Sequence, residues 1–311
     1  MKQNTVGLNS KRNPPALSSS LRSIAPAEDG RVRRAGNQHA KLILGLIGSP
    51  RKLGNCEVFV KEIARSIPGN CRLKLVRLPA LTIEPCLACY GCVMDLACPH
   101  MDDMEPLLQQ IVEADAIIIA TPVYFLGCHS IFKRILDRGF LFYTVLEKTF
   151  GKPCILVNFY GIKNRVGVAT QTLMSLASFL GLNIKTHVNV RAALPGEVLT
   201  DPRKREIANK LARMLFSDKK AKISHGCPFC GCDTVRMEKG RFTCALCHGT
   251  FSIDDQGKRV KIKDGGIFGS PEHMLLHKTW LKGMKEEFLK KRKEILRITL
   301  PYKDDGEWIR F

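Results

Sequence analysis

Residues 41–57 read KLILGLIGSPRKLGNCE and carry the clearest indication of the fold class. The first part of this stretch, KLILGLIGS (41–49), is a continuous apolar run of the kind found in parallel strands that are buried on both faces. The run ends in Gly48 and Ser49 and leads into NCEVFVKEIARSI (55–67), where apolar residues recur near helical spacing. A buried strand, a short loop and an amphipathic helix are the first half of a βαβ unit.

The same alternation of strand and helix continues along the chain. Further strands are expected at 71–78, 115–125, 152–161 and 183–190, and helices at 103–114, 130–140, 171–181 and 201–216. Five strands that alternate with helices predict an α/β fold with a doubly wound, five-stranded parallel sheet, because right-handed crossovers place helices on both faces. Ligands bind such sheets at the carboxyl ends of the strands. We therefore expect the loops at 48–56, 82–102, 121–129 and 158–168 to surround one site.

Length and composition bound the class of protein. A chain of 311 residues is long enough for two modules, and its net charge of +20 leaves nucleic acid open as a partner. No apolar run is long enough for a membrane span and no secretory signal is recognisable, so a cytoplasmic protein without a membrane partner is expected. Residues 1–40 read as a disordered basic tail. In a reducing compartment, clustered cysteines serve metals or catalysis rather than disulfides.

The loop after the first strand has the composition of an anion cradle. Free backbone N–H groups and the dipole at the start of a helix favour a negative charge. Ser49 and Asn55 add polar donors, Arg51 adds a positive charge, and Gly54 permits close backbone approach. The alternative is a capped helix entry that binds nothing.

A second loop, CLACYGCVMDLACPH (86–100), holds four cysteines with the spacing C-x2-C-x2-C-x5-C. They are Cys86, Cys89, Cys92 and Cys98. Four thiolates in one short loop are the usual ligand set of a 4Fe-4S cluster, whereas zinc sites more often use two separated pairs. No serine, histidine and aspartate triad or carboxylate pair stands at a suitable position, so the chemistry is expected to belong to cofactors.

Three motifs in this order carry a family resemblance: GSPRKLGN (48–55), CLACYGCVMDLACPHMDDM (86–104), and IIIATPVYF (117–125) followed by SIFKRILDR (130–138). Over about residues 41 to 215 the chain resembles flavodoxin-like NAD(P)H-dependent FMN reductases, in particular their iron-sulfur flavoprotein branch. The resemblance implies a flavodoxin-like sheet of strand order 2-1-3-4-5. It also implies FMN as a cofactor.

The resemblance assigns residues to the flavin. The phosphate-loop positions are Ser49, Arg51, Gly54 and Asn55, together with Cys56, which stands where the family usually has serine or threonine. The segment bordering the isoalloxazine ring is Pro122, Val123, Tyr124 and Phe125. Tyr124 and Phe125 could instead be strand-end core, and a third loop around Tyr160 and Gly161 is a weaker match.

Together these features predict an electron-transfer flavoprotein that passes electrons between a 4Fe-4S cluster and FMN. NAD(P)H or ferredoxin would be the electron donor, and the resemblance implies a homo-oligomer. A cluster-free NAD(P)H-dependent FMN reductase is one alternative. A redox-responsive nucleic-acid-binding protein that uses a C-terminal zinc ribbon and the basic tail is another, although no pattern of interleaved basic and aromatic residues supports it.

The chain beyond residue 218 predicts a separate module. CPFCGCDTVRMEKGRFTCALCHGTF (227–251) contains two C-x2-C knuckles, formed by Cys227, Cys230, Cys244 and Cys247. This arrangement is typical of a zinc ribbon with a structural ion, and a rubredoxin-like iron site is the alternative. Cys232 and His248 are expected to be bystanders.

The expected domains follow from these segments. They are a flavodoxin-like domain at 41–218 with its cysteine loop at 82–102, a ribbon at 225–263, and a C-terminal amphipathic helix and tail at 270–311. The helix is expected at 273–296, with Trp280, Met284 and Phe288 toward one side.

Overall fold

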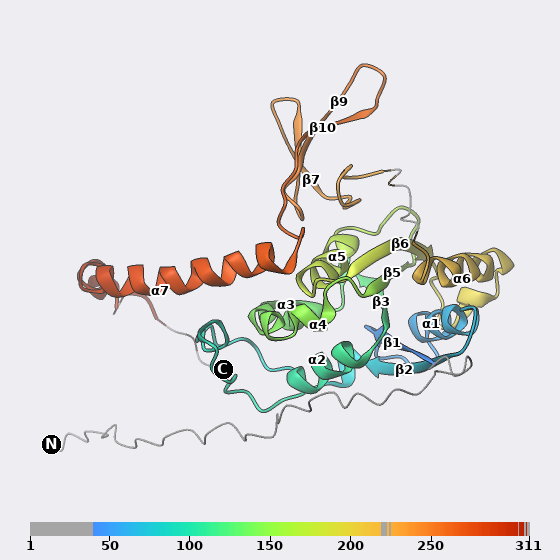
Figure 1. Cartoon of the computed structure of the whole chain (residues 1–311), viewed down its shortest axis with the longest axis horizontal. Helices are drawn as coiled ribbons and strands as arrows, with labels where there is room; N and C mark the ends of the chain where they lie inside the picture. The colour runs from blue at the N-terminus through green and yellow to red at the C-terminus, as the bar shows by residue number, and fades with distance from the viewer. Residues whose placement is uncertain (1–39, 219–222, 224, 304, 308, 310–311) are drawn as a thin grey trace, which may run out of the picture. The chain divides into compact units, whose positions relative to one another are not determined.

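A computed structural model describes residues 40–218, 223, 225–303, 305–307 and 309 (Figure 1). Apart from Ala40, the basic tail expected at 1–40 lies outside these residues, as does most of the segment at 219–224 that joins the two predicted modules. From Ala40 onward, the described residues form one compact unit. The boundaries expected at 41–218, 225–263 and 270–311 stay predictions.

The central sheet has five parallel strands in the order β2-β1-β3-β5-β6. Their bounds are β1 Lys41–Ile47, β2 Cys71–Arg77, β3 Ala116–Tyr124, β5 Pro153–Tyr160 and β6 Asn183–Arg191. Counting these five strands alone, the order is 2-1-3-4-5, so the predicted α/β class and strand order are confirmed. The strands that are most continuously apolar, β1, β3 and β5, occupy the middle of the sheet, where both faces are covered.

A short strand, β4 (Gly127–Cys128), was not expected. It pairs antiparallel with the end of β3, with Val123 opposite Cys128 and Tyr124 opposite Gly127. The end of β3 is therefore one arm of a tight hairpin.

Helices cover both faces of the sheet (Figure 1). On one face, α1 (Asn55–Arg65) and α6 (Pro202–Leu215) share a buried cluster with the strands. On the other, α2 (Met104–Glu113), α3 (Ile131–Asp137), α4 (Leu146–Thr149) and α5 (Ala169–Phe179) form a second cluster. Successive residues of a strand point to opposite faces, so Ile43 belongs to the first cluster and Leu44 to the second. Each fully buried aliphatic side chain contributes about 1.5–3 kcal/mol to folding.

One predicted helix ends early. A helix was expected at 130–140, but α3 stops at Asp137 and Gly139–Thr144 forms a 3-10 helix. Glycine is a poor helix former, and the tighter turn places Leu141 and Phe142 in the core. The change of helix type also brings Arg138 and Phe140 to the cavity formed by the cysteine loop.

The C-terminal module contains an antiparallel sheet of order β10-β9-β8-β7. Its strands are β7 Val235–Glu238, β8 Arg241–Cys244, β9 Thr250–Ile253 and β10 Arg259–Lys263. The last helix, α7 (Pro271–Thr299), begins at Ser270, whose hydroxyl accepts a hydrogen bond from the N–H of His273. Among the described residues, no helix has the length and apolar character needed to cross a membrane.

Candidate functional site

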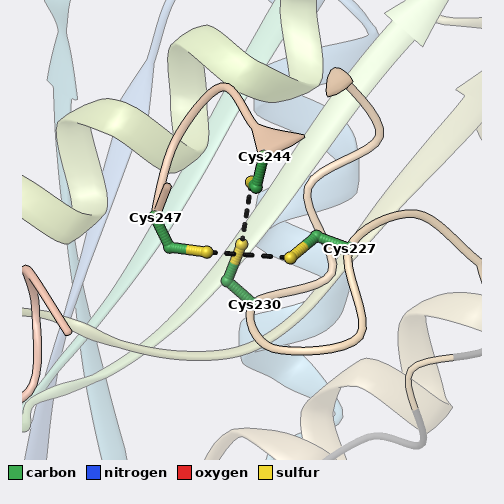
Figure 2. Close-up of side chains that lie close together, drawn as sticks. All are labelled: Cys227, Cys230, Cys244 and Cys247. Carbon is green, nitrogen blue, oxygen red and sulfur yellow. Dashed lines mark hydrogen bonds between the residues drawn. The ribbon is translucent and has the colours of Figure 1, made fainter. Parts of the chain in front are cut away.

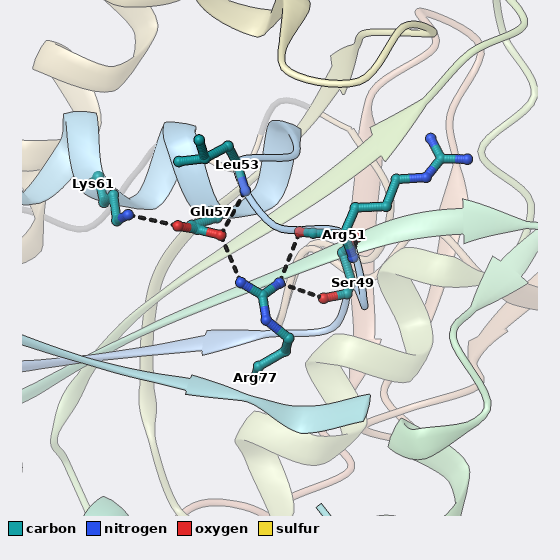
Figure 3. Close-up of polar contacts among 6 residues, drawn as sticks. All are labelled: Ser49, Arg51, Leu53, Glu57, Lys61 and Arg77. Atoms are coloured by element: carbon teal, nitrogen blue, oxygen red, sulfur yellow. Dashed lines mark hydrogen bonds and ion pairs between the residues drawn. The ribbon is translucent and has the colours of Figure 1, made fainter. Parts of the chain in front are cut away.

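The first βα loop is held in place by Arg77, at the end of the neighbouring strand (Figure 3). One guanidinium nitrogen of Arg77 donates to the backbone carbonyls of Ser49 and Arg51, at 2.9 and 2.8 Å. Its other terminal nitrogen lies 2.6 Å from the carboxylate of Glu57. Arg77 thus fixes the path of the loop without entering its open side. Sequence reasoning missed both Arg77 and Glu57.

Glu57 is the hub of this network. Its carboxylate accepts hydrogen bonds from the N–H of Leu53 at 2.9 Å and from the ammonium group of Lys61 at 2.5 Å. Burial opposes ionisation, but the hydrogen bonds from Lys61 and Arg77 outweigh it and lower the pKa of Glu57 from 4.5 to about 2. The one local signal in the sequence was an acidic residue in the first turn of a helix, where the helix dipole favours it.

The low pKa predicts an acid-sensitive fold. Because the pKa is lower in the folded state, ionised Glu57 stabilises the protein above about pH 4.5, and this contribution is lost as pH falls toward about 2. We expect the free energy of unfolding of the wild type to fall over this range by roughly 2–3 kcal/mol more than that of Glu57→Gln. Urea unfolding at a series of pH values measures both. Lys61→Met, which removes one partner, should give an intermediate slope, whereas parallel profiles for wild type and Glu57→Gln would contradict the prediction.

Two expected ligands in this loop have other roles. The side-chain nitrogen of Asn55 donates to the carbonyls of Ala192 and Leu194, and its oxygen accepts from the N–H of Val198. With both ends of its amide engaged, Asn55 anchors the segment after β6 rather than donating into the loop. Cys56 is buried in the core cluster under α1, and burial raises its pKa to about 12. The side chains of these two residues are therefore engaged elsewhere, while their backbone N–H groups still face the loop, and the predicted role of both positions in cofactor binding stays a prediction.

The remaining groups suit an anion. Gly54 is the N-cap of α1 and provides no side-chain cap, so the N–H groups of the first turn keep their capacity to donate. A Cβ atom at Gly54 would lie 3.3 Å from the Cβ of Arg51 and 3.8 Å from the hydroxyl of Ser49, so glycine leaves the mouth of the loop open. The Arg51 side chain is exposed there. A helix start with open donors, a hydroxyl and an exposed guanidinium can hold a phosphate.

The segment 122–125 forms the hairpin between β3 and β4. Phe125 and Leu126 are its two turn residues and both have positive φ, 46° and 64°. Two-residue turns of this kind usually contain asparagine or glycine, because bulky residues are strained there. Tyr124 is 41% exposed and Phe125 is fully exposed, so neither is a core residue. The strained turn therefore exposes apolar side chains at the carboxyl edge of the sheet.

The loop that follows β5 is hydrogen-bonded to this turn. The N–H of Val168 donates to the carbonyl of Leu126 at 2.8 Å. A Cβ atom on Gly167 would lie only 2.0 Å from that carbonyl oxygen, so glycine is required for the approach. Pro122 and Val123 lie within β3 itself, where they set the direction of the turn.

The four cysteines of the second loop surround one cavity of about 180 Å³. Cys86, Cys89, Cys92 and Cys98 all line it. Ala88, Tyr90 and Asp95 in this loop have positive φ, which aspartate tolerates but which is unfavourable for alanine and tyrosine. Burial raises the pKa of Cys92, and the nearby thiols of Cys98 and Cys86 add to the shift. The backbone is therefore bent around a common centre at a cost in strain.

A buried arginine faces this cavity. Arg138 forms an ion pair with Asp102, and the two side chains are 1% and 2% exposed. A second guanidinium nitrogen of Arg138 lies 3.3 Å from the sulfur of Cys98, and its Nε has no hydrogen-bond partner among the described residues. Burial raises the pKa of Asp102, but hydrogen bonds from the N–H groups of Glu84 and Met104 and from Arg138 lower it overall. The Asp102 carboxylate balances the charge of Arg138, and a guanidinium N–H is left pointing at the sulfur of Cys98, where it can donate to a thiolate.

The C-terminal helix contacts the outside of the cysteine loop, which sequence reasoning did not foresee. Lys278 and Lys282 of α7 both form ion pairs with Asp95. On the same side, the hydroxyl of Tyr143 lies 2.6 Å from Nδ1 of His277. The start of α7 therefore packs against the loop that carries the four thiols.

In the ribbon, four sulfur atoms converge on one point (Figure 2). They belong to Cys227, Cys230, Cys244 and Cys247, and all lie within 4.8 Å of one another. The sulfurs of Cys227 and Cys247 are 3.6 Å apart, as are those of the other two cysteines. The N–H groups of Leu246 and Gly249 donate to sulfur. Four sulfurs at ~2.3 Å from one zinc ion would lie ~3.8 Å apart, which matches the observed pairs.

The two ribbon knuckles have the same backbone turn. The residue after the second cysteine of each knuckle, Gly231 or His248, has positive φ, at 80° and 58°. The His248 side chain is exposed, and Cys232 is buried outside the group of four. Elsewhere in the described ranges no such compact group of possible ligands occurs, so the cysteines around the 180 Å³ cavity are spaced more widely than a single ion requires.

Comparison with known proteins agrees with this geometry. A family model described as NADPH-dependent FMN reductase matches residues 42–193. An iron-sulfur flavoprotein of Methanocaldococcus jannaschii is 34% identical over 98 residues, which are 31% of this chain and 51% of that protein. One from Methanosarcina thermophila is 32% identical over 130 residues, 41% of this chain and 60% of that protein. The chain thus spans about half the length of the curated relatives it matches.

A solved structure described as flavone reductase has a similar fold. The TM-score is 0.62 at 17% sequence identity, and the match covers 87% of this chain and 100% of that one. The likeness supports the fold over most of the described residues.

Proposed function

Because residues 42–193 belong to the NADPH-dependent FMN reductase family and are similar to iron-sulfur flavoproteins, we propose that this protein is an FMN-dependent oxidoreductase that exchanges electrons with a 4Fe-4S cluster. One observation carries the proposal. The loop suited to an anion follows β1, the exposed aromatic turn follows β3, and the four-cysteine loop follows β2. These three strands are neighbours in the sheet. All three loops therefore leave the same edge of the sheet.

For the flavin, the residues divide into two groups. The first-turn N–H groups of α1, the Ser49 hydroxyl and Arg51 would bind the phosphate. Pro122, Val123, Tyr124 and Phe125 would border the ring, with the strained turn as a rigid apolar wall that excludes water. Bound FMN supplies hydride or single-electron chemistry, and NAD(P)H or a reduced ferredoxin would be the donor.

For the cluster, the spacing of the thiols is the supporting observation. A 4Fe-4S core lies between its four ligands and holds them farther apart than one zinc ion would. Cys86, Cys89, Cys92 and Cys98 around a shared cavity fit the larger group. Arg138 would donate a hydrogen bond to the thiolate of Cys98. A cluster carries single electrons, which complements the chemistry of FMN.

The ribbon has a different role in this proposal. Zinc bound by Cys227, Cys230, Cys244 and Cys247 has a complete tetrahedral ligand set and no open position for catalysis. We therefore assign the ribbon a structural ion.

The test is a cofactor analysis of anaerobically purified protein. FMN, iron, sulfide and zinc are measured, and reduction of the flavin is followed with NAD(P)H and with reduced ferredoxin. Cys98→Ala should lose iron and sulfide but retain FMN. Cys71→Ala, at the start of the edge strand β2, removes only a thiol that donates to the carbonyl of Ala64 in α1 and should keep both cofactors. Protein that contains FMN but no iron would favour the alternative of a cluster-free reductase. Salt-sensitive DNA binding by protein without flavin would reject the proposal.

A further inference from the structure

The strand β6 (Asn183–Arg191) forms one edge of the parallel sheet (Figure 1). Among the described residues its only strand partner is β5, and no backbone hydrogen bond joins its outer side to another segment. In an edge strand, alternate N–H and C=O groups point away from the sheet and can pair with an added strand. With nine residues, β6 is longer than an average strand and offers several such groups.

A cavity of about 1130 Å³ runs along β6. All eight residues at 183–190 line it, so the cavity follows the strand for nearly its whole length. Eight strand residues span roughly 26 Å, at about 3.3 Å per residue. This length matches an extended peptide better than a compact small molecule, which would occupy only part of the cavity.

The cavity has apolar walls on both faces of the sheet. On the face covered by α6 they are Ile207, Leu211 and Met214, and on the face covered by α5 they are Met174, Phe229 and Phe268. Successive side chains of a strand point to opposite faces, so those of an added strand would alternate between the two walls. Strand addition uses main-chain hydrogen bonds for affinity and such walls for specificity.

The charged lining of the cavity is basic. Lys185, His187, Lys210 and His225 line it, and the described residues around it include no aspartate or glutamate. The ammonium group of Lys185 donates to the carbonyl of Ser217 at 2.8 Å, while Lys210 is exposed on α6. Opposite charges across an interface favour a partner, whereas like charges exclude it. An acidic ligand therefore complements the cavity, and a second copy of this basic edge does not.

A buried polar atom gives an independent indication of a ligand. His187 lines the cavity, and its Nε2 atom is buried without a hydrogen-bond partner among the described residues. The ring of His225 lies 5.7 Å from the His187 ring and meets it edge-on. Because buried polar atoms are almost always hydrogen-bonded, the Nε2 atom indicates that a group bound in the cavity completes its contacts.

We propose that β6 binds an extended, acidic segment of a partner protein, which adds to the edge of the sheet as a further strand. The main chain of this segment pairs with the outer side of β6. Its acidic side chains face Lys210, and its apolar side chains pack on the opposite wall. The site goes beyond the redox function proposed above, since only Cys230 among the lining residues belongs to a site assigned there, that of the structural ion.

Synthetic peptides test strand addition on the full-length, zinc-loaded protein. The probe is an end-blocked peptide of eight residues in which glutamate and valine alternate, and its binding is measured by fluorescence anisotropy. It should bind in a salt-sensitive manner, whereas the same peptide with lysine in place of glutamate should not bind. If the glutamate peptide does not bind at millimolar concentration, or the lysine peptide binds equally well, the proposal is wrong.

Two methylated peptides test the backbone pairing. In a strand, the N–H groups of all glutamates point to one edge and those of all valines to the other. N-methylation of one of the two sets should therefore weaken binding about tenfold or more, and N-methylation of the other set should have little effect. Equal binding by the two methylated peptides would exclude strand addition.

Protein variants and hydrogen exchange locate the site. Lys210→Glu should weaken binding of the glutamate peptide about fivefold. The matched control, Arg213→Glu, changes another exposed residue of α6 that does not line the cavity, and it should leave binding unchanged. The peptide should also slow amide exchange across Asn183–Arg191. Unchanged exchange in β6 with the peptide bound would overturn the proposal, as would self-association that Lys210→Glu abolishes, because a second copy would then occupy the cavity.

Discussion

The Arg138→Met variant is expected to unfold with a free energy about 3–5 kcal/mol below that of the wild type. The substitution leaves the Asp102 carboxylate, only 2% exposed, without its charged partner in a site that excludes water. Removing one member of a buried ion pair costs more than the pair itself contributes, because the remaining charge stays buried. Urea unfolding near neutral pH, in the absence of added cofactors, measures the difference.

Two further variants make this prediction specific. Arg134 lies in α3, one turn before Arg138, and its exposed guanidinium donates to the carbonyl of Ile83. Arg134→Met should lower the free energy of unfolding by only about 0.5 kcal/mol. Arg138→Met combined with Asp102→Asn removes both charges and should recover part of the loss. If the double variant were as unstable as the single one, packing of the arginine side chain rather than its charge would explain the effect.

Cys244→Ala is expected to abolish folding of the ribbon while leaving the α/β domain folded. The apparent binding free energy of structural zinc is about 10–16 kcal/mol in small domains, and it is available only when the ligand set is complete. The buried ribbon core is small, since Leu246 and Phe251 are its chief apolar members besides cysteines. We expect loss of about one equivalent of zinc per chain and rapid amide exchange across residues 227–263.

The control for this experiment lies in the same ribbon. Cys232 is also buried, but it stands outside the group of four sulfurs, so Cys232→Ala should retain the metal and slow amide exchange. Slow exchange in metal-free Cys244→Ala would show that the ribbon folds without an ion. Iron in place of zinc in the wild-type ribbon would favour the rubredoxin-like alternative.

The sequence predicted the sheet well because its central strands are encoded locally. Runs such as AIIIA in β3 are apolar on both faces and can form little other than a buried strand. The β3–β4 hairpin was missed because its turn residues, Phe125 and Leu126, carry none of the usual asparagine or glycine signals. Strain at that turn overrides the local preference, as often occurs at functional sites.

The candidate site was predicted at the level of loops rather than of side chains. Topology alone indicates which loops meet at the edge of a parallel sheet. It does not show that the Asn55 amide turns toward the segment after β6, 137–143 residues away. The pairs Arg77 with Glu57 and Arg138 with Asp102 were equally hidden, because each joins charged residues 20 or 36 positions apart. Long-range pairing of this kind leaves no local pattern.

The ion pairs between Asp95 and α7 also bear on the order of events during synthesis. Lys278 and Lys282 leave the ribosome 183 and 187 residues after Asp95. At 5–20 residues per second, translation takes roughly 10 to 40 s to cover that interval. Throughout this time the four-thiol loop exists without the helix that later packs against its outer side. The nascent chain therefore passes through a stage in which the outer side of the loop is uncovered, and it stays so until residues 278–282 have been made.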